Sequence, residues 1–395
     1  MQNARACIDT AKCKACPVCN GLACRNTIPG PGAKGVGDTA IRNYQKWQDI
    51  RVQMDTLHEN KPVDMSVQLF GRKFSYPFFA GPVGAIGLHY GNAYDELTYN
   101  KILVSACAEN GIAAFTGDGL DEKVMISACE AIAAAGGAGI PTVKPWNLPL
   151  VEEKLQLVKK SGAFAVAMDV DAAGLPFLKN MQPPAGSKSV EELAEIVKAA
   201  GIPFIVKGVM TVRGALKAHA AGAAAIIVSN HGGRVLDQCS ATAEVLEEIC
   251  HAVGGGMKVL VDGGIRSGVD IFKALALGAD GVVIARPFVT AVYGGAEEGV
   301  KVYNELEAAW YSARGIKYDG VDYRIFKNLT SIHKITFINS KIIVNKEIDF
   351  ECTMYAKKDI KHYSEQELAS MCDTRDNVYY LSLIHISEPT RLRCI

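Results

Sequence analysis

Short apolar runs alternate with amphipathic stretches from Pro77 onward, and this alternation is the strongest pattern in the chain. The runs recur about every 20 to 40 residues, which is a spacing typical of strand–helix units. The stretches between them, such as "VEELAEIVKAAG", carry leucine and isoleucine at helical spacing and end in glycine, the residue expected just past a helix. The eight runs are Pro77–Gly84, Gly111–Gly117, Gly139–Pro145, Ala163–Asp171, Ile202–Val209, Ala224–Asn230, Met257–Gly263 and Asp280–Arg286.

Near-continuous apolar strands indicate a parallel sheet covered by helices. Eight strand–helix units are the number that closes a barrel, and about 230 residues is an ordinary size for one. The alternative is an open, doubly wound sheet, which normally has a glycine-rich phosphate loop after its first strand. The first run ends in "GPVGAIG", which lacks that spacing. The sequence therefore predicts an α/β protein with a (β/α)8 TIM barrel.

The barrel fold predicts where the chemistry lies, because catalytic groups of such barrels sit at the C-terminal ends of the strands. Polar residues follow nearly every apolar run here, as the rim of an active site requires. They are Thr116, Lys144, Asp171, Lys207, Ser229, His231, Asp262 and Arg286. Polar residues also end strands in ordinary loops, so it is their convergence on one face that favours a site.

The sixth run is followed by "SNHGGR", in which His231 and Arg234 flank two glycines. The glycines allow the backbone to pass close to a planar ligand. An arginine offers a planar fork for a carboxylate, and a histidine takes up a proton near neutral pH. Asp171 is placed to hold the imidazole, and Lys207 supplies a positive charge suited to an anionic reduced cofactor. This set suits a 2-hydroxy acid as substrate.

The last two runs end in "DGGIRSG" and "ARP". In barrels, the loops after strands seven and eight commonly form a phosphate site. Gly263 and Gly264 expose backbone N–H groups, Arg266 and Arg286 add positive charge, and a helix expected to begin near Ser267 contributes its positive end. The pattern predicts a phosphate-bearing cofactor.

Five of the twelve cysteines lie within the first 24 residues. Four of them, Cys13, Cys16, Cys19 and Cys24, have the spacing C-x2-C-x2-C-x4-C. Four thiolates so close together suit an iron–sulfur cluster or a tetrahedral zinc ion. The spacing differs by one residue from a bacterial ferredoxin run, so both centres and unligated cysteines stay open.

The charge balance excludes several classes of partner. Lys plus Arg and Asp plus Glu number 42 each, which argues against nucleic acid or an anionic membrane held by charge. No apolar run approaches the roughly 20 residues that span a bilayer. The N-terminus has no hydrophobic core for export, so a cytoplasmic protein is expected.

Composition divides the chain into three parts. Residues 1–34 form a cysteine-rich N-terminal extension, and residues 35–310 hold the barrel and its lead-in. The lead-in includes a hairpin-like stretch, "VDMSVQLFGRKFSYP", expected to cover the N-terminal mouth of the barrel. Residues 311–395 are rich in Ile, Lys and Asn and are expected to be a tail that is not native to the barrel; the stretch "LSLIHISEPTRLR" looks like a translated sequencing adapter.

The stretch "IPFIVKGV", then "SNHGGR", then "VLVDGGIRSGVDIFKALALGADGVVIARP" closely resembles the FMN-dependent 2-hydroxy acid oxidases and dehydrogenases, which include glycolate and lactate oxidases. The resemblance covers roughly Gly35 to Tyr303. It implies an eight-fold β/α barrel with FMN across the C-terminal ends of its strands.

The resemblance also implies roles for single residues. His231 is expected to be the catalytic base, oriented by Asp171, and Arg234 with His231 is expected to bind the substrate. Residues expected to contact FMN are Thr116, Lys144, Lys207, Ser229, Asp262, Gly263, Gly264, Arg266, Ala285 and Arg286. Two departures stand out, since Trp146 takes the place of an active-site tyrosine and Lys144 that of a glutamine.

Two classes of function stay open on the sequence. The first is oxidation of a small 2-hydroxy acid to the 2-oxo acid with FMN. The second is an FMN-binding barrel that acts as an isomerase or as a non-catalytic binding protein. The retained His231, Arg234, Lys207 and Asp171 favour the first class. The acid, the electron acceptor and the oligomeric state, with a homo-oligomer among the options, are not determined.

Overall fold

The computed structural model describes residues 1–28, 30–52, 64–175, 178, 185–313, 336–338 and 341–343. The chain divides into two compact units, Met1–Asp319 and Gly320–Ile395. Within the second unit the described part is one antiparallel hairpin of β11 (Thr336–Ile338) and β12 (Lys341–Ile343). Most of the expected tail, including the adapter-like stretch, lies outside the described residues.

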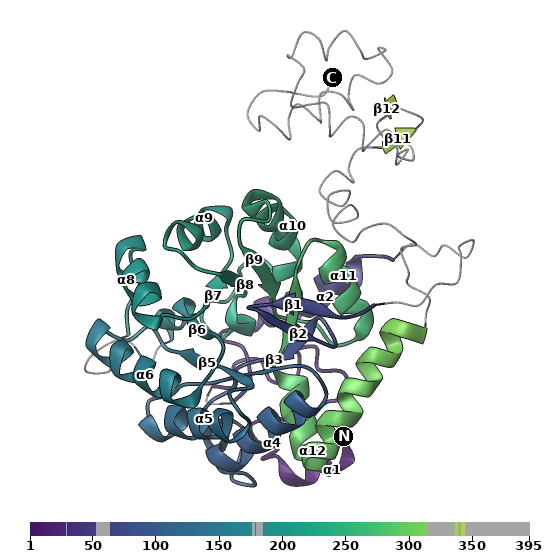
Figure 1. Ribbon diagram of the computed structural model, residues 1–395. Helices are drawn as coiled ribbons and strands as arrows, with labels where there is room; N and C mark the ends of the chain where they lie inside the picture. The colour runs from purple at the N-terminus through teal and green to yellow at the C-terminus, as the bar shows by residue number, and fades with distance from the viewer. Residues whose placement is uncertain are drawn as a thin grey trace. The chain divides into compact units, whose positions relative to one another are not determined.

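Eight parallel strands close into a barrel in the order β10-β3-β4-β5-β6-β7-β8-β9. Figure 1 shows this barrel, with seven of its strands labelled, β3 to β9. Each strand falls within one of the eight apolar runs, so the predicted (β/α)8 barrel is confirmed. The strands are β3 (Phe78–Ala80), β4 (Ala114–Thr116), β5 (Gly139–Val143), β6 (Val166–Asp169), β7 (Phe204–Val209), β8 (Ala225–Val228), β9 (Lys258–Val261) and β10 (Gly281–Ile284).

Helices surround the barrel and connect its strands (Figure 1). The α-helices are α1 (Gln2–Cys7), α2 (Asp38–Asp49), α3 (Ile86–Tyr90), α4 (Glu96–Glu109), α5 (Glu122–Ala134), α6 (Leu148–Ser161), α8 (Val190–Ala200), α9 (Val212–Ala220), α10 (Thr242–Val253), α11 (Gly268–Ala276) and α12 (Arg286–Ala313). Two short 3-10 helices follow strands, η1 (Val170–Gly174) and η2 (His231–Gly233). Among the described residues, no helix combines the length and the apolar character needed to cross a membrane.

Local sequence signals explain the helix ends. Helix α8 begins with a capping box, in which Ser189 and Glu192 each accept a hydrogen bond from the other's backbone N–H. It ends at Gly201, whose φ of +67° is favourable for glycine. Helix α11 begins after Ser267, as predicted, and the Ser267 side chain accepts from the N–H of Asp270.

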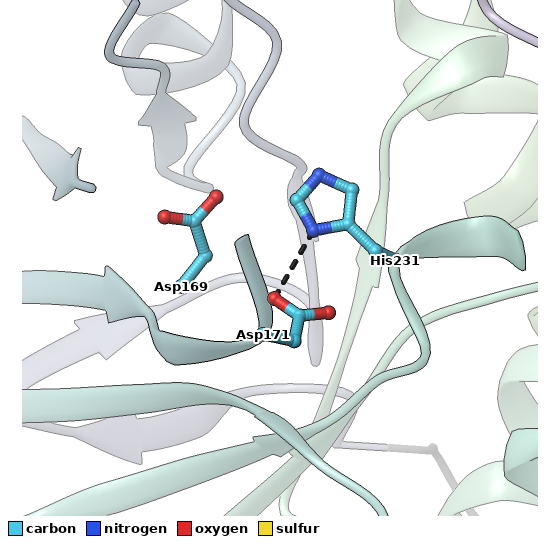
Figure 2. A group of neighbouring side chains, drawn as sticks. All are labelled: Asp169, Asp171 and His231. Atoms are coloured by element: carbon cyan, nitrogen blue, oxygen red, sulfur yellow. Dashed lines mark hydrogen bonds and ion pairs between the residues drawn. The ribbon is translucent and has the colours of Figure 1, made fainter. Parts of the chain in front are cut away.

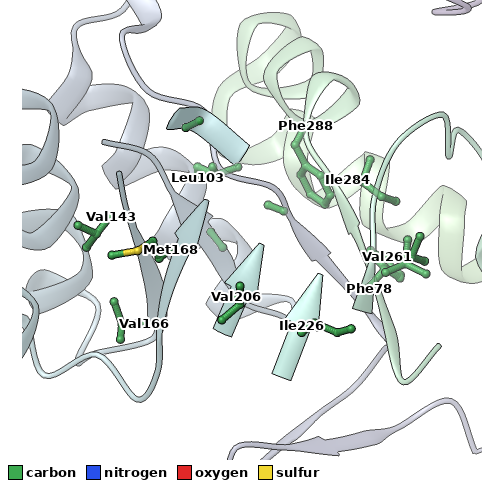
Figure 3. Close-up of a cluster of buried hydrophobic side chains, with 14 of the residues drawn as sticks. Phe78, Leu103, Val143, Val166, Met168, Val206, Ile226, Val261, Ile284 and Phe288 are labelled. Atoms are coloured by element: carbon green, nitrogen blue, oxygen red, sulfur yellow. The ribbon is translucent and has the colours of Figure 1, made fainter. Parts of the chain in front are cut away.

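Alternate residues of each strand build two separate cores. Phe78, Val143, Met168 and their counterparts belong to the core between the strands and the helices, part of which Figure 3 draws. The residues between them face the interior of the barrel. This inner core contains Phe79, Phe115, Ile140, Ala167, Ile205, Ile227, Leu260 and Val283. The two-residue period of a strand produces this division.

The hairpin of β1 (Val67–Leu69) and β2 (Arg72–Phe74) contributes to the inner core at the N-terminal end of the barrel. The Phe74 ring packs edge-on against Phe79 with centroids 5.1 Å apart, and it also lies 5.8 Å from Phe164. Phe79 is an inward residue of β3, and Phe164 comes just before β6. The hairpin therefore covers the N-terminal mouth, as the sequence predicts.

Candidate active site

A cavity of about 910 Å³ lies at the C-terminal ends of the strands. The floor of this cavity is formed by the inward-facing strand residues that come after those of the inner core. One step of two residues beyond Ile140, Ala167, Ile205 and Leu260 come polar side chains instead of apolar ones. These are Thr142, Asp169, Lys207 and Asp262, and all four line the cavity. The barrel interior thus changes from apolar to charged at this end, which is the end that the fold predicts for a site.

His231 and Asp171 form the central pair, because Nδ1 of His231 lies 3.1 Å from Oδ1 of Asp171 (Figure 2). Burial disfavours a charged imidazole, and Lys207 adds to this effect, so that the pKa of His231 lies below its usual value despite the attraction of Asp171. Burial alone would raise the pKa of Asp171, but the nearby cations outweigh it and lower the pKa. An ionised Asp171 accepts from Nδ1–H, which leaves Nε2 of a neutral His231 with a free lone pair.

Lys207 is buried at the end of β7 and donates from Nζ to Oγ of Ser229, 3.0 Å away. The same ammonium lies 3.4 Å from Oδ2 of Asp262. Burial would lower the pKa of Lys207, but Asp262 and the other carboxylates around it outweigh burial and raise the pKa. Lys207 is therefore a fixed positive charge in the floor of the cavity.

Lys144 and Asp169 form a second charged pair, with Nζ and Oδ2 2.5 Å apart. Asp169 also lies near the His231 pair, and one oxygen of each carboxylate and a nitrogen of His231 all fall within 4.8 Å of one another. Three such ligands could surround a cation. The ammonium groups of Lys144 and Lys207 already supply positive charge there, so the arrangement favours proton handling over metal binding.

Arg234 reaches into the cavity from η2 and is anchored by the N-terminal segment. Its Nη1 donates to the carbonyl oxygens of Gly30 and Gly32, with the second at 3.1 Å. Ile28 and Pro31 of the same segment line the cavity. The segment therefore contributes backbone carbonyls to the site.

His89 also lines this cavity, and sequence reasoning missed it. Its Nδ1 accepts a hydrogen bond from the N–H of Gly30, 3.1 Å away. Burial, reinforced by Arg234 and Lys144, lowers the pKa of His89 to about 3. His89 is therefore neutral, with its proton on Nε2. Its sole sequence signal was a histidine in the loop after the first barrel strand.

The sequence predicts a phosphate site in the loops after strands seven and eight, here called the phosphate end. In the structure these loops pack closely on the backbone of α2, and two arginines lie beside them. Gly263 and Gly264 have φ of +87° and +82°, and a Cβ on Gly264 would lie 2.2 Å from the carbonyl oxygen of Asn43 in α2. Only glycine fits there. Arg266 and Arg286 also line the cavity, and Arg266 comes just before Ser267, the N-cap of α11.

Several buried polar atoms near the cavity have no hydrogen-bond partner within the part of the chain that the structure describes. They are Thr142 Oγ1, Asp169 Oδ1, Asp262 Oδ1 and Arg286 Nη1, whose residues line the cavity, and Asp171 Oδ2 behind His231. Buried polar groups are normally paired, and most of these atoms surround one cavity. Together with the phosphate end, they fit a polar, phosphate-bearing cofactor such as FMN.

Most of the predicted site residues converge on the cavity. Those that line it are Lys144, Lys207, His231, Arg234, Asp262, Gly263, Gly264, Arg266, Ala285 and Arg286. Asp171 and Ser229 lie behind them and bond to His231 and Lys207.

Thr116 and Trp146 differ from the expectation. Thr116 follows Phe115, an inward residue, so the strand alternation turns Thr116 toward the helices, and it does not line the cavity. Thr142 offers a hydroxyl there instead. Trp146 is buried and donates its Nε1–H to Oδ2 of Asp118 at 2.8 Å, so this N–H is engaged within the protein.

The four spaced cysteines are half-buried and free. Cys19 contacts Arg266 of the phosphate end. Arg266 donates from Nε to the carbonyl oxygen of Cys19 at 2.7 Å, and Nη2 of Arg266 lies 3.6 Å from the Cys19 Sγ. Burial would raise the pKa of Cys19, but Arg266 and Arg286 outweigh burial and lower it. The extension therefore packs directly on the predicted cofactor site.

The family model of the FMN-dependent dehydrogenases matches residues 31–180 and 177–308. The chain belongs to this family. It is an FMN-dependent oxidoreductase of the 2-hydroxy acid oxidase and dehydrogenase group. The match begins after the four cysteines and spans the whole barrel.

Relatives and solved structures agree with this assignment. The chain is 33% identical to a peroxisomal (S)-2-hydroxyacid oxidase of Arabidopsis thaliana over 67% of this chain and 79% of that protein. It is 29% identical to a 4-hydroxymandelate oxidase of Amycolatopsis orientalis, over 72% and 89% respectively. Mandelate oxidase with benzoyl-formic acid superimposes with a TM-score of 0.60 at 28% identity, covering 71% of this chain and 85% of that one.

Proposed function

We propose that the protein oxidises a small 2-hydroxy acid to the corresponding 2-oxo acid, with FMN as its cofactor. The observation that carries the proposal is the pairing, in one cavity, of a neutral His231 that offers Nε2 with the cation of Arg234. When FMN is bound, it supplies the acceptor for the two electrons that leave the substrate.

Arg234 and His231 divide the work on the substrate. The guanidinium binds the carboxylate. Its Nη1 is held by Gly30 and Gly32, and a guanidinium has further N–H groups that suit a planar anion. Nε2 of His231 takes a proton from the substrate, from the hydroxyl or from C2. Asp171 stabilises the imidazolium that forms, because its carboxylate lies 3.1 Å from Nδ1.

His89 adds a donor to the same cavity. His231 presents a lone pair, whereas His89 presents an N–H, because their Nδ1 atoms have opposite hydrogen-bonding roles. We assign the Nε2–H of His89 to the substrate carboxylate or hydroxyl. It is a candidate for the polar contact of the active-site tyrosine that Trp146 replaces.

The remaining charges belong to the cofactor. Arg266, Arg286 and the backbone N–H groups of Gly263 and Gly264 suit its phosphate, and Lys207 suits the negative charge of its reduced ring. A single phosphate end favours FMN over FAD. We extend the proposal to a thiolate-bound metal centre at Cys13, Cys16, Cys19 and Cys24.

The test is anaerobic mixing of the yellow protein with a panel of small 2-hydroxy acids while the flavin absorbance is followed. At least one acid should bleach wild type. His231→Ala should keep its flavin yet bleach about 10²–10⁴-fold more slowly, the usual effect of losing a positioned base. Bleaching of His231→Ala at the wild-type rate would refute this role and favour the isomerase or binding-protein alternative.

A further inference from the structure

The proposed oxidation leaves one wall of the cavity without a role. This apolar wall comprises Ile28, Pro31, Leu88, Leu120, Leu175 and Leu178. We propose that the apolar wall binds the side chain of the substrate, so that the protein prefers 2-hydroxy monocarboxylic acids with a branched or aromatic side chain. Glycolate, lactate and dicarboxylic hydroxy acids are then poorer substrates. This inference rests on the proposed function and narrows its substrate class.

One part of the apolar wall belongs to the segment that holds Arg234. The carbonyl oxygen of Gly30 accepts a hydrogen bond from Nη1 of Arg234, and the N–H of Gly30 donates to Nδ1 of His89. Ile28 lies two residues before Gly30, Pro31 follows it directly, and both line the cavity. These apolar side chains therefore lie on the same short segment as the contacts that hold the proposed carboxylate ligand.

A second part of the apolar wall follows Asp171, the partner of His231. Asp171 lies in η1, and this helix ends at Leu175. Leu175 and Leu178 are both buried, and the N–H of Leu178 donates to the carbonyl oxygen of Leu175 at 3.1 Å. The loop that positions the proposed base thus also brings two leucines to the cavity. A substrate bound between His231 and Arg234 has apolar surface on both sides.

The remaining leucines are exposed. The exposed fractions of Leu88 and Leu120 are 49% and 47%, and both side chains line the cavity. A single exposed leucine is ordinary, but two at one cavity form an apolar surface that a ligand can cover. Leu88 is next to His89, the proposed donor to the substrate. The surface that awaits a ligand is therefore next to a group assigned to the substrate.

Acidic groups accompany these leucines and disfavour a second carboxylate on the substrate. Glu96 lines the cavity and accepts a hydrogen bond from the N–H of Ile86, the first residue of the helix that contains Leu88. Asp121 follows Leu120 and lines the cavity as well. Like charges repel, so a dicarboxylic hydroxy acid is rejected while an apolar side chain is accepted.

The first test compares substrates by anaerobic flavin bleaching of the FMN-loaded protein. The series is glycolate, lactate, 2-hydroxybutyrate, 2-hydroxyisocaproate and 3-phenyllactate, with malate as the dicarboxylic acid. The concentration for half-maximal bleaching should fall about fourfold for each methylene that becomes buried. Malate should need a higher concentration than 2-hydroxybutyrate, which has the same number of carbon atoms. Equal concentrations along the series, or a preference for glycolate or malate, would overturn the inference.

A second measurement separates this inference from the proposed function. Phenylacetate and acetate have no hydroxyl group to oxidise, and their binding is followed by the change in the flavin absorption spectrum. Phenylacetate should bind at least about tenfold more tightly than acetate. Tight phenylacetate binding in a protein that no hydroxy acid bleaches would refute the proposed function and leave the apolar wall standing. Bleaching with equal affinity for the two carboxylates would refute the apolar wall alone.

A variant locates the contact. Leu120→Ser changes an exposed side chain, and it should raise the half-maximal concentration of 3-phenyllactate about 3- to 30-fold while that of glycolate stays the same. The matched control is Leu216→Ser in α9, because Leu216 is equally exposed, at 46%, and is not among the described residues that line the cavity. Apoprotein of both variants should bind FMN as wild type does. Weaker FMN binding by Leu120→Ser with unchanged substrate preference would show that this leucine packs on the flavin, and would overturn its assignment.

Discussion

The two ends of the barrel are made from the same strands but differ in what their inward residues do. At the N-terminal end, Phe74 of the hairpin packs on Phe79 and Phe164, and the interior is apolar. At the C-terminal end, the next inward positions are charged, as at Lys207 and Asp262, and several of their neighbours have polar atoms without partners among the described residues. The N-terminal end contributes stability by burying apolar surface. At the C-terminal end the buried charged groups cost desolvation free energy, but they are held in place for a functional site.

The largest expected effect is on chemistry at the charged end. Asp171→Asn should keep the fold and the flavin but slow bleaching by substrate about 10²–10⁴-fold. The amide cannot stabilise the imidazolium of His231, and it also permits the wrong tautomer. Because Asp171 raises the pKa of His231, the acid limb of the rate profile should also move to lower pH. A variant with the wild-type rate and profile would contradict the pairing.

The second effect is on stability at the apolar end. Phe74→Ala should lower the free energy of unfolding by about 3–5 kcal/mol, the usual cost of removing a buried aromatic ring. Urea unfolding measures it, and Lys73→Ala, an exposed position on the same strand, is the control. Below the transition, bleaching kinetics should match wild type. A changed rate in the folded variant would mean that the two ends are not independent.

A smaller effect is expected on cofactor affinity, and it distinguishes binding of the FMN phosphate from binding of the flavin ring. Arg266→Ala should weaken FMN by about 10- to 100-fold, since hydrogen bonds to charged groups contribute about 1.5–3 kcal/mol. Riboflavin, which lacks the phosphate, should bind the variant and wild type about equally. Titration of the apoprotein with both flavins gives the comparison. Equal losses for the two ligands would place the phosphate elsewhere.

The smallest effect is the dependence of stability on pH. The pKa of His89 is about 3 in the folded protein, below its ordinary value of 6.5. Between these values the unfolded chain binds more protons, so His89 makes stability fall as the pH drops below about 6.5. His89→Gln should lose about 1 kcal/mol less than wild type between pH 7 and pH 5.5. Thermal melts at the two pH values measure it, and parallel losses would show that His89 is not buried as a neutral group.

Residues that follow a regular strand were predictable from the sequence. Lys207 and Asp262 come where a strand ends, and a strand end in a parallel barrel has one possible location. Thr116 shows the limit of this rule. Thr116 also ends a strand, but successive residues of a strand face opposite sides, so a shift of one residue decides whether the last side chain faces the interior. The run "GIAAFTG" does not show which of its residues face inward.

The contacts around His89 and Gly30 could not be predicted, because they join segments 59 residues apart in the sequence. No local propensity records which loop will meet the N-terminal extension. The direction of the Gly30 N–H fixes the tautomer of His89, and burial among cations fixes its neutral state.

The sequence by itself determined the barrel, since eight apolar strands with amphipathic helices can bury their surfaces in few other ways. It also determined the set of charged residues at one end. Only the tertiary structure decided which nitrogen of each histidine faces the cavity and which carbonyls hold Arg234. Those outcomes depend on hydrogen-bond geometry between distant segments, and that geometry exists only after the barrel has closed.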